Sequence, residues 1–262
     1  MMLWRAVLPS VCRAILWVVW MTAGIVVLAV SVEKADQGLD VVFAAVRFQV
    51  VAALVWLSPL ILACGVCLSG LRRRSCGAEQ ALASSGIGWP QLTPIILMVG
   101  VSYGIAGLGV SEWVLPMVAD SGLPGWIWAG AGPVRTADGL RVSLEAAGTL
   151  QYVDSIAVGE AFPRMASTSV LMASETVAAS TELIARWARV LACVGWAWFG
   201  LIAGRFRYPL IVVVAASGVM LVIEAILWSM AAQAQIAPWV GGGIPAVLWL
   251  VPVIFCFRQS ST

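Results

Sequence analysis

Ala14-Ile-Leu-Trp-Val-Val-Trp-Met-Thr-Ala-Gly-Ile-Val-Val-Leu-Ala-Val-Ser-Val32 is an unbroken apolar run without a charged residue. A helix needs about 20 such residues to cross the roughly 30 Å of hydrocarbon in a bilayer. The run is long for the apolar core of a signal peptide, and no small-x-small cleavage site follows it. A transmembrane helix is therefore favoured over a cleaved leader.

Five further apolar stretches follow, roughly over residues 48–68, 94–114, 188–203, 209–230 and 236–257. The chain is 61% hydrophobic and 11% charged, whereas soluble domains carry roughly 25% charged residues. We therefore predict a membrane all-α fold with six transmembrane helices in a 3+3 arrangement.

A polar segment separates the two groups of three. We expect three domains: helices 1–3 over residues 1–116, a periplasmic segment with a linker over 117–185, and helices 4–6 over 186–262. Within the segment, apolar and polar residues alternate over 140–145, and Asp138-Gly139 favours a hairpin. A second apolar-rich run covers residues 150–158. These patterns predict a small antiparallel sheet of about four strands.

Basic residues gather in four regions that share one side of the predicted membrane protein, and this pattern predicts a cytoplasmic location for both termini. The basic residues of these regions are Arg5 and Arg13, Arg72 to Arg74, Arg205 and Arg207, and Arg258.

The composition also limits the function. The net charge of +2 gives no support for nucleic-acid binding, and the absence of histidine removes histidine-based catalysis and metal ligation. The only lysine, Lys34, is not in a phosphate-binding loop, so an ATP-driven function would need a separate ATPase subunit. We expect no enzyme activity in this chain, no cofactor and no metal.

Cys64-Gly-Val-Cys67 has the spacing of a redox cysteine pair. One interpretation is a membrane thiol oxidoreductase. The other is that the two cysteines are small buried residues on a packed helix. Redox pairs usually lie at a helix N-terminus, whereas this pair lies late in a predicted span, so packing is favoured.

Glycines line the third predicted span at 100, 104, 107 and 109, and Gly241 to Gly243 open the sixth. Close helix packing is favoured over a flexible gate wall. Glu112 and Glu224 lie inside or at the edge of spans, where ionisable groups face a cavity or a partner. An ion pair of Glu224 with Arg186 or Arg189 and a substrate contact both remain open.

The loop over residues 70–93 lies on the basic side and includes a predicted short helix. Ser75 can cap it, residues 78–85 can propagate it and Gly86 can end it. An interfacial loop and a coupling helix that docks on a cytoplasmic ATPase are both compatible with this pattern.

The order of motifs resembles the lipopolysaccharide-export permease family (LptF/LptG, also YjgP/YjgQ). Ala81-Leu-Ala-Ser-Ser-Gly-Ile87 is similar to the family's "LRAxGI" loop segment, and Ser111-Glu-Trp-Val-Leu-Pro116 to its "GEWVxP" end of span three. Glu182-Leu-Ile-Ala-Arg-Trp187 resembles "ELxxR" before span four, and the segment 236–245 resembles "PPWLxxWLP" before span six. The match covers nearly all of the membrane part, and Glu112-Trp113-Val114 favours the G-type half.

This resemblance implies a multi-pass permease subunit of the bacterial inner membrane. A second LptF/LptG-type permease would pair with it, and an LptB-like cytoplasmic ATPase dimer would drive the pair. Lipopolysaccharide would then pass from the membrane lipid to LptC/LptA-like periplasmic bridge proteins. The substrate-path candidates are Lys34, Arg47, Glu112, Arg186, Arg189 and Glu224. The ATPase-coupling candidates are Arg74, Glu79, Leu82 and Gly86.

The chain departs from the family in two places. Ala78 and Ala83 stand where the family's coupling segment carries an acidic residue and an arginine, and Glu79 is one position off. The polar segment is also much shorter than the family's β-jellyroll, so it can form only part of one. These departures motivate one alternative, an accessory subunit that does not transport. A secondary transporter is disfavoured because no inverted repeat is evident.

Overall fold

The computed structural model describes residues 2–35, 39–86, 89–115, 134–135, 141–142, 168–173 and 176–259. This part of the chain is mostly helical, as predicted. The helices are α1 (Met2–Glu33), α2 (Leu39–Trp56), α3 (Ser58–Ser75), α4 (Ala78–Ser84), α5 (Trp89–Gly109), the π-helix η1 (Val110–Val114), α8 (Thr168–Ala173), α9 (Val177–Ala203), α10 (Pro209–Ala232) and α11 (Pro238–Gln259).

Three helical stretches within the described residues are long and apolar enough to cross a membrane: Val7–Glu33, Gln91–Val114 and Pro209–Ala232. The bent pair Ala45–Trp56 and Ser58–Ser75 gives a fourth if it is counted as one span. These helices indicate a membrane protein with three or four spans by length and composition.

The second predicted span is broken at Leu57. The helices on its two sides are bent by 68°, so the prediction of one continuous helix over 48–68 is wrong. Pro59 has no N–H to donate to the carbonyl oxygen of Val55. The buried Ser58 hydroxyl donates to that oxygen instead, at 2.8 Å. The local sequence therefore satisfies the carbonyl that proline would otherwise leave without a donor.

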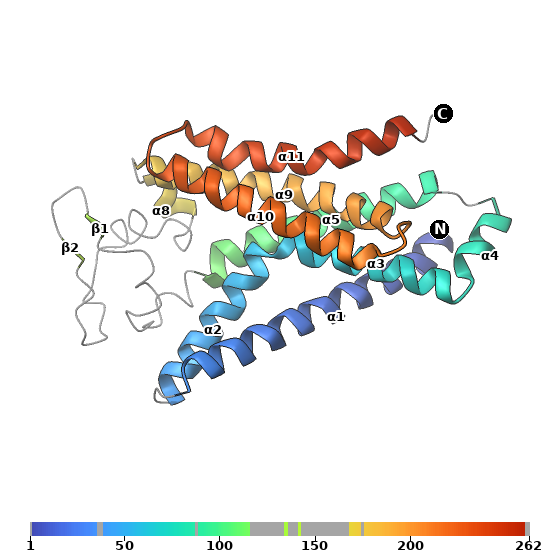
Figure 1. Ribbon diagram of the computed structural model, residues 1–262, viewed down its shortest axis with the longest axis horizontal. Helices are drawn as coiled ribbons and strands as arrows, with labels where there is room; N and C mark the ends of the chain where they lie inside the picture. Colours follow the sequence, from blue (N-terminus) through green and yellow to red (C-terminus); the bar gives the residue numbers. More distant parts are fainter. Residues whose placement is uncertain are drawn as a thin grey trace.

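Helix α9 lies at the centre of the bundle and packs against α3, α5, α10 and α11. In Figure 1, α4 and the N-terminal end of α1 lie at one end of the molecule, and α8 lies at the other. We call these the α4 end and the α8 end.

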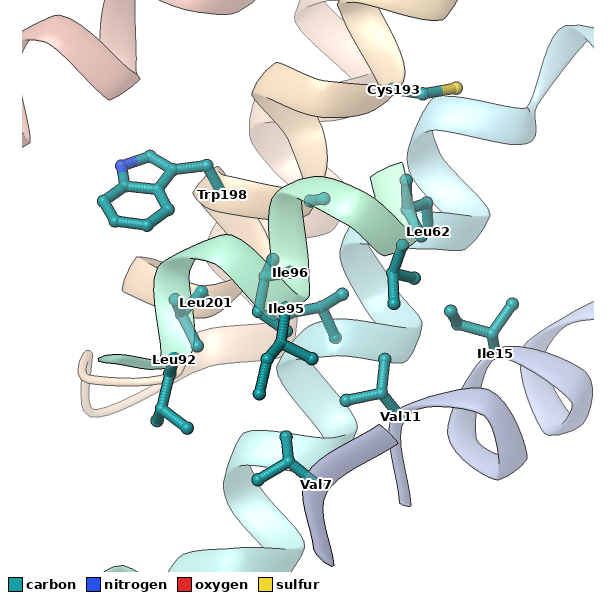
Figure 2. Packing of buried hydrophobic residues seen from close by; sticks show 13 residues of the cluster. Val7, Val11, Ile15, Leu62, Leu92, Ile95, Ile96, Cys193, Trp198 and Leu201 are labelled. Carbon is teal, nitrogen blue, oxygen red and sulfur yellow. The ribbon is translucent and has the colours of Figure 1, made fainter. Parts of the chain in front are cut away.

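The main hydrophobic core joins α1, α3, α5 and α9. Figure 2 shows side chains from these four helices pointing toward one another, among them Val11 of α1, Leu62 of α3 and Ile95 of α5. These three residues are completely buried. In contrast, α1 and α10 expose many large apolar side chains, including Trp17, Trp20 and Ile211. Burial of this second set needs lipid or a partner protein.

Glycines allow the backbones around α9 to approach closely. A Cβ at Gly104 of α5 would lie 2.9 Å from the Cα of Val190, and one at Gly100 would lie 3.0 Å from the Cα of Val194. A Cβ at Gly242 of α11 would lie 2.6 Å from the carbonyl oxygen of Thr181. The predicted packing role is thus confirmed for Gly100, Gly104, Gly241 and Gly242, whereas Gly107 and Gly243 have ordinary spacing.

Only a small part of the predicted sheet lies within the described residues. Strands β1 (Val134–Arg135) and β2 (Arg141–Val142) pair antiparallel, with Val134 opposite Val142. The predicted turn at Asp138-Gly139 and the run over 150–158 lie outside the described residues. The four-stranded sheet therefore stays a prediction.

We expect Gly200→Ala to destabilise the helix bundle. Its Cβ would lie 2.9 Å from the Cα of Ala63 on α3, a backbone atom that cannot rotate away. Overpacking of this kind costs about 1–3 kcal/mol, which should lower the thermal unfolding midpoint of the detergent-solubilised chain. Gly218→Ala on α10 is the matched control because nothing lies within 4 Å of its Cβ. Equal midpoints for the two variants would contradict close packing of α9 on α3.

Candidate functional site

A buried charged pair lies near the α8 end of α9. Arg186 and Glu182 are one helical turn apart and only 2% and 1% exposed. The Nε of Arg186 lies 3.4 Å from Oε1 of Glu182. A buried guanidinium requires such a partner because an unpaired charge in a dry interior is costly.

Glu112 approaches the same arginine from η1. Its Oε2 lies 3.8 Å from Nη1 of Arg186 and also accepts a hydrogen bond of 2.7 Å from the backbone N–H of Thr168. A π-helical turn inserts an extra residue into a helix and changes the direction of its side chains, and such turns are frequent at functional sites. The turn over Val110–Val114 thus carries Glu112 where α5 ends.

Trp228 completes this cluster from α10. Its indole N–H donates to Oε2 of Glu182 at 3.2 Å. Four segments of the chain (η1, α8, α9 and α10) therefore meet through Glu112, Thr168, Glu182, Arg186 and Trp228, which we call the α8-end cluster. It contains two carboxylates and one guanidinium, so an incoming phosphate could bind Arg186 only by competing with carboxylates.

The structure brings together two of the six predicted substrate-path residues, Glu112 and Arg186. Arg189 lies one turn further along α9. Lys34 forms an ion pair of 2.8 Å with the adjacent Glu33 at the end of α1. Arg47 is exposed on α2.

Glu224 does not form the ion pair considered from the sequence. It is half-buried on α10, and within the described residues it makes no ion pair with Arg186 or Arg189. Arg186 forms its ion pairs with Glu112 and Glu182 instead. Glu182 and Trp228 were not predicted as site residues, although the i, i+4 spacing of Glu182 and Arg186 is a signal for an ion pair on one helix face.

A second polar arrangement lies at the α4 end and joins the two halves of the chain. The Nε of Arg74 lies 2.8 Å from Oε2 of Glu79 on α4. The Nη1 of the same arginine donates to the carbonyl oxygen of Gly204, which follows α9. Arg74 thus connects α4 with the loop between α9 and α10, so two predicted coupling residues are in contact.

Two glycines bracket α4. Gly77 precedes it with φ 69° and Gly86 follows it with φ 72°, a backbone conformation that favours glycine. The predicted helix end at Gly86 is confirmed. The predicted cap at Ser75 is wrong: its hydroxyl donates to the carbonyl oxygen of Arg72, and Gly77 occupies the capping position. Leu82 is half-buried on α4.

The cysteine pair lies in the helix bundle. Cys64 and Cys67 are free and buried on α3, and each packs in a cluster with α9 residues such as Trp196. Among the described residues, no group of three cysteine or carboxylate side chains could hold a metal ion.

Comparison with known proteins adds no assignment to this geometry. No protein-family model matches the chain, and no curated protein matches it.

We expect Arg186→Gln and Glu182→Gln each to destabilise the bundle by about 3 kcal/mol, because each removes the nearest opposite charge of a buried group. The double variant should cost less than the sum of the two, since the residues are in contact. Unfolding in mixed detergent micelles, followed by far-UV circular dichroism, would measure this. Glu224→Gln is the control, with an expected change within about 0.5 kcal/mol. Additive effects of the two single changes would contradict the pairing.

Proposed function

We propose that this chain is the permease subunit of an ATP-driven lipopolysaccharide exporter, closer to the G-type half. In this proposal the six apolar stretches are six transmembrane helices, and the segment over 117–185 is a shortened periplasmic jellyroll. Both termini face the cytoplasm of the bacterial inner membrane. The chain moves lipid without covalent chemistry.

One observation carries this proposal. Two motifs that lie far apart in the sequence, Ser111–Pro116 and Glu182–Trp187, supply the charged residues of the α8-end cluster. Their resemblance to family motifs therefore coincides with a physical contact. The cluster lies at the end of the spans from which, in this proposal, lipid A would leave. Arg189, which is half-buried, would meet a lipid A phosphate, since guanidinium groups bind phosphate oxygens in a bidentate manner. Arg186 would do so only by exchanging Glu112 or Glu182 for the phosphate.

The α4 end supports a coupling role. Arg74 ties α4 to the loop after α9, so force applied to α4 would reach helices of both halves. In the proposal, an ATPase dimer closes on binding ATP and pushes on the loop over 70–93. The two permeases then rock against each other and expel lipid upward to the periplasmic bridge proteins.

Large apolar side chains on α1 and α10 support partners in the membrane. Trp17, Trp20 and Ile211 are each more than half exposed. A second permease and acyl chains are apolar enough to cover such surfaces.

The proposal predicts that the tagged chain, solubilised gently from its native membranes, recovers an ATPase and a second permease identified by mass spectrometry. Arg74→Gln should lower ATPase recovery several-fold, because Glu79 of α4 loses its ion pair with Arg74 and α4 thereby loses its link to Gly204. Arg207→Gln is the control, since this arginine is exposed and its guanidinium carbon lies 5.3 Å from the ring centroid of its neighbour Tyr208. Recovery of the chain alone, from a lysate rich in those subunits, would favour the accessory-subunit alternative.

The thiol oxidoreductase alternative makes a different prediction. We expect the double variant Cys64→Ala, Cys67→Ala to retain partner recovery and growth complementation, because buried free thiols act as small apolar groups. Alanine is preferred to serine because it buries no additional hydroxyl group. Loss of function in a variant that still elutes as a folded protein would support the thiol enzyme.

A further inference from the structure

A cavity of about 450 Å³ opens at the α4 end, where α1, α3 and α4 meet. This volume is within the range of ligand pockets, roughly 300–1,000 Å³. Arg72 and Arg73 line it from α3, and Val7 of α1 and Leu82 of α4 contribute apolar walls. The α8-end cluster is not part of this cavity.

Arg73 is the residue that points to an anionic ligand. Its Nη1 is buried and has no hydrogen-bond partner among the described residues. The nearby carboxylate of Glu79 forms its ion pair with Arg74, whose Nε lies 2.8 Å from Oε2. Glu79 therefore acts on Arg73 as a nearby charge, and Nη1 has no hydrogen bond to replace its lost hydration. An anion in the cavity would supply that bond.

The hydroxyl protons of two serines that line the same cavity, Ser10 and Ser69, are already donated to other protein atoms. Ser10 donates to the carbonyl oxygen of Val7 at 2.8 Å. A hydroxyl has one proton, so Ser69 is the donor in the 3.1 Å contact between the Ser10 and Ser69 oxygens. This pair holds α1 against α3, and recognition of an anion is left to the two arginines.

The apolar walls decide between a free anion and a lipid. Val7 belongs to α1, the helix that carries a candidate membrane span, so the cavity lies beside a membrane helix. Inorganic phosphate would leave the exposed Ala81 and the half-buried Leu82 uncovered, whereas a phospholipid offers a phosphate and an acyl chain together. Basic pockets between membrane helices bind anionic head groups in this way.

We propose that this cavity binds an anionic phospholipid from the adjacent leaflet, with Arg72 and Arg73 on its phosphate and an acyl chain along α1. This site is independent of the proposed export function. The lipid contacts α4 through Leu82 and therefore stabilises the docked position of that helix.

Native mass spectrometry of the full chain in neutral detergent tests the proposal. The probes are short-chain phosphatidylglycerol, phosphatidylcholine with the same chains, and inorganic phosphate. We expect selective retention of phosphatidylglycerol. The double variant Arg72→Gln, Arg73→Gln should lower its retention roughly tenfold or more, because charge-assisted contacts to phosphate are lost. Arg207→Gln removes one charge outside the cavity and should retain the lipid.

A second variant keeps both arginines. Ala81→Trp fills the cavity from α4 and should also abolish retention. The proposal is overturned by wild-type retention in the double arginine variant or by an equal loss in Arg207→Gln. Equal retention of phosphatidylcholine, or displacement of phosphatidylglycerol by inorganic phosphate, also overturns it. A last outcome also overturns it: both cavity variants keep wild-type lipid retention but no longer recover a protein partner. The cavity would then bind a protein and not a lipid.

Discussion

The arrangement of the bundle depends on how closely other helices can approach α9. Glycines at 100 and 104 of α5, 200 of α9 and 242 of α11 stand where a Cβ would meet backbone atoms of a neighbouring helix. In a bilayer the lipid tails are as apolar as the side chains, so this fit contributes more to association than burial does. The buried pair of Arg186 and Glu182 lies on the same helix, and the close packing keeps water away from it.

Long apolar runs made the helices predictable. Each predicted apolar stretch falls on a described helix or pair of helices, because a run of about 20 apolar residues has few stable alternatives to a membrane helix. The break at Leu57 was not predicted because hydropathy does not change there. Its signal was Pro59, which removes a hydrogen bond that Ser58 then replaces. The sheet was not testable to the same extent, since most of its residues lie outside the described ranges.

The candidate site was predictable only in part, because it depends on tertiary contacts. Arg186 and Glu112 were singled out as ionisable groups near the membrane edge, but their contact depends on the π-helical turn, which no sequence pattern indicated. Glu224 has the same chemistry, yet it lies on a part of α10 without an ion-pair partner among the described residues. Arg74 and Glu79 were easier to predict because they are close in sequence, whereas the contact of Arg74 with Gly204 spans 130 residues.

That last contact limits the mechanical freedom of the protein. Arg74 is held by Glu79 on one side and by a backbone carbonyl of the second half on the other. A displacement of α4 must either break this bridge or carry the turn between α9 and α10 with it. The first and second halves of the chain are therefore tied together at this end by a polar contact, in addition to the packing of α9 on α3 and α5. A load on α4 is thereby passed to the second half through a single arginine side chain.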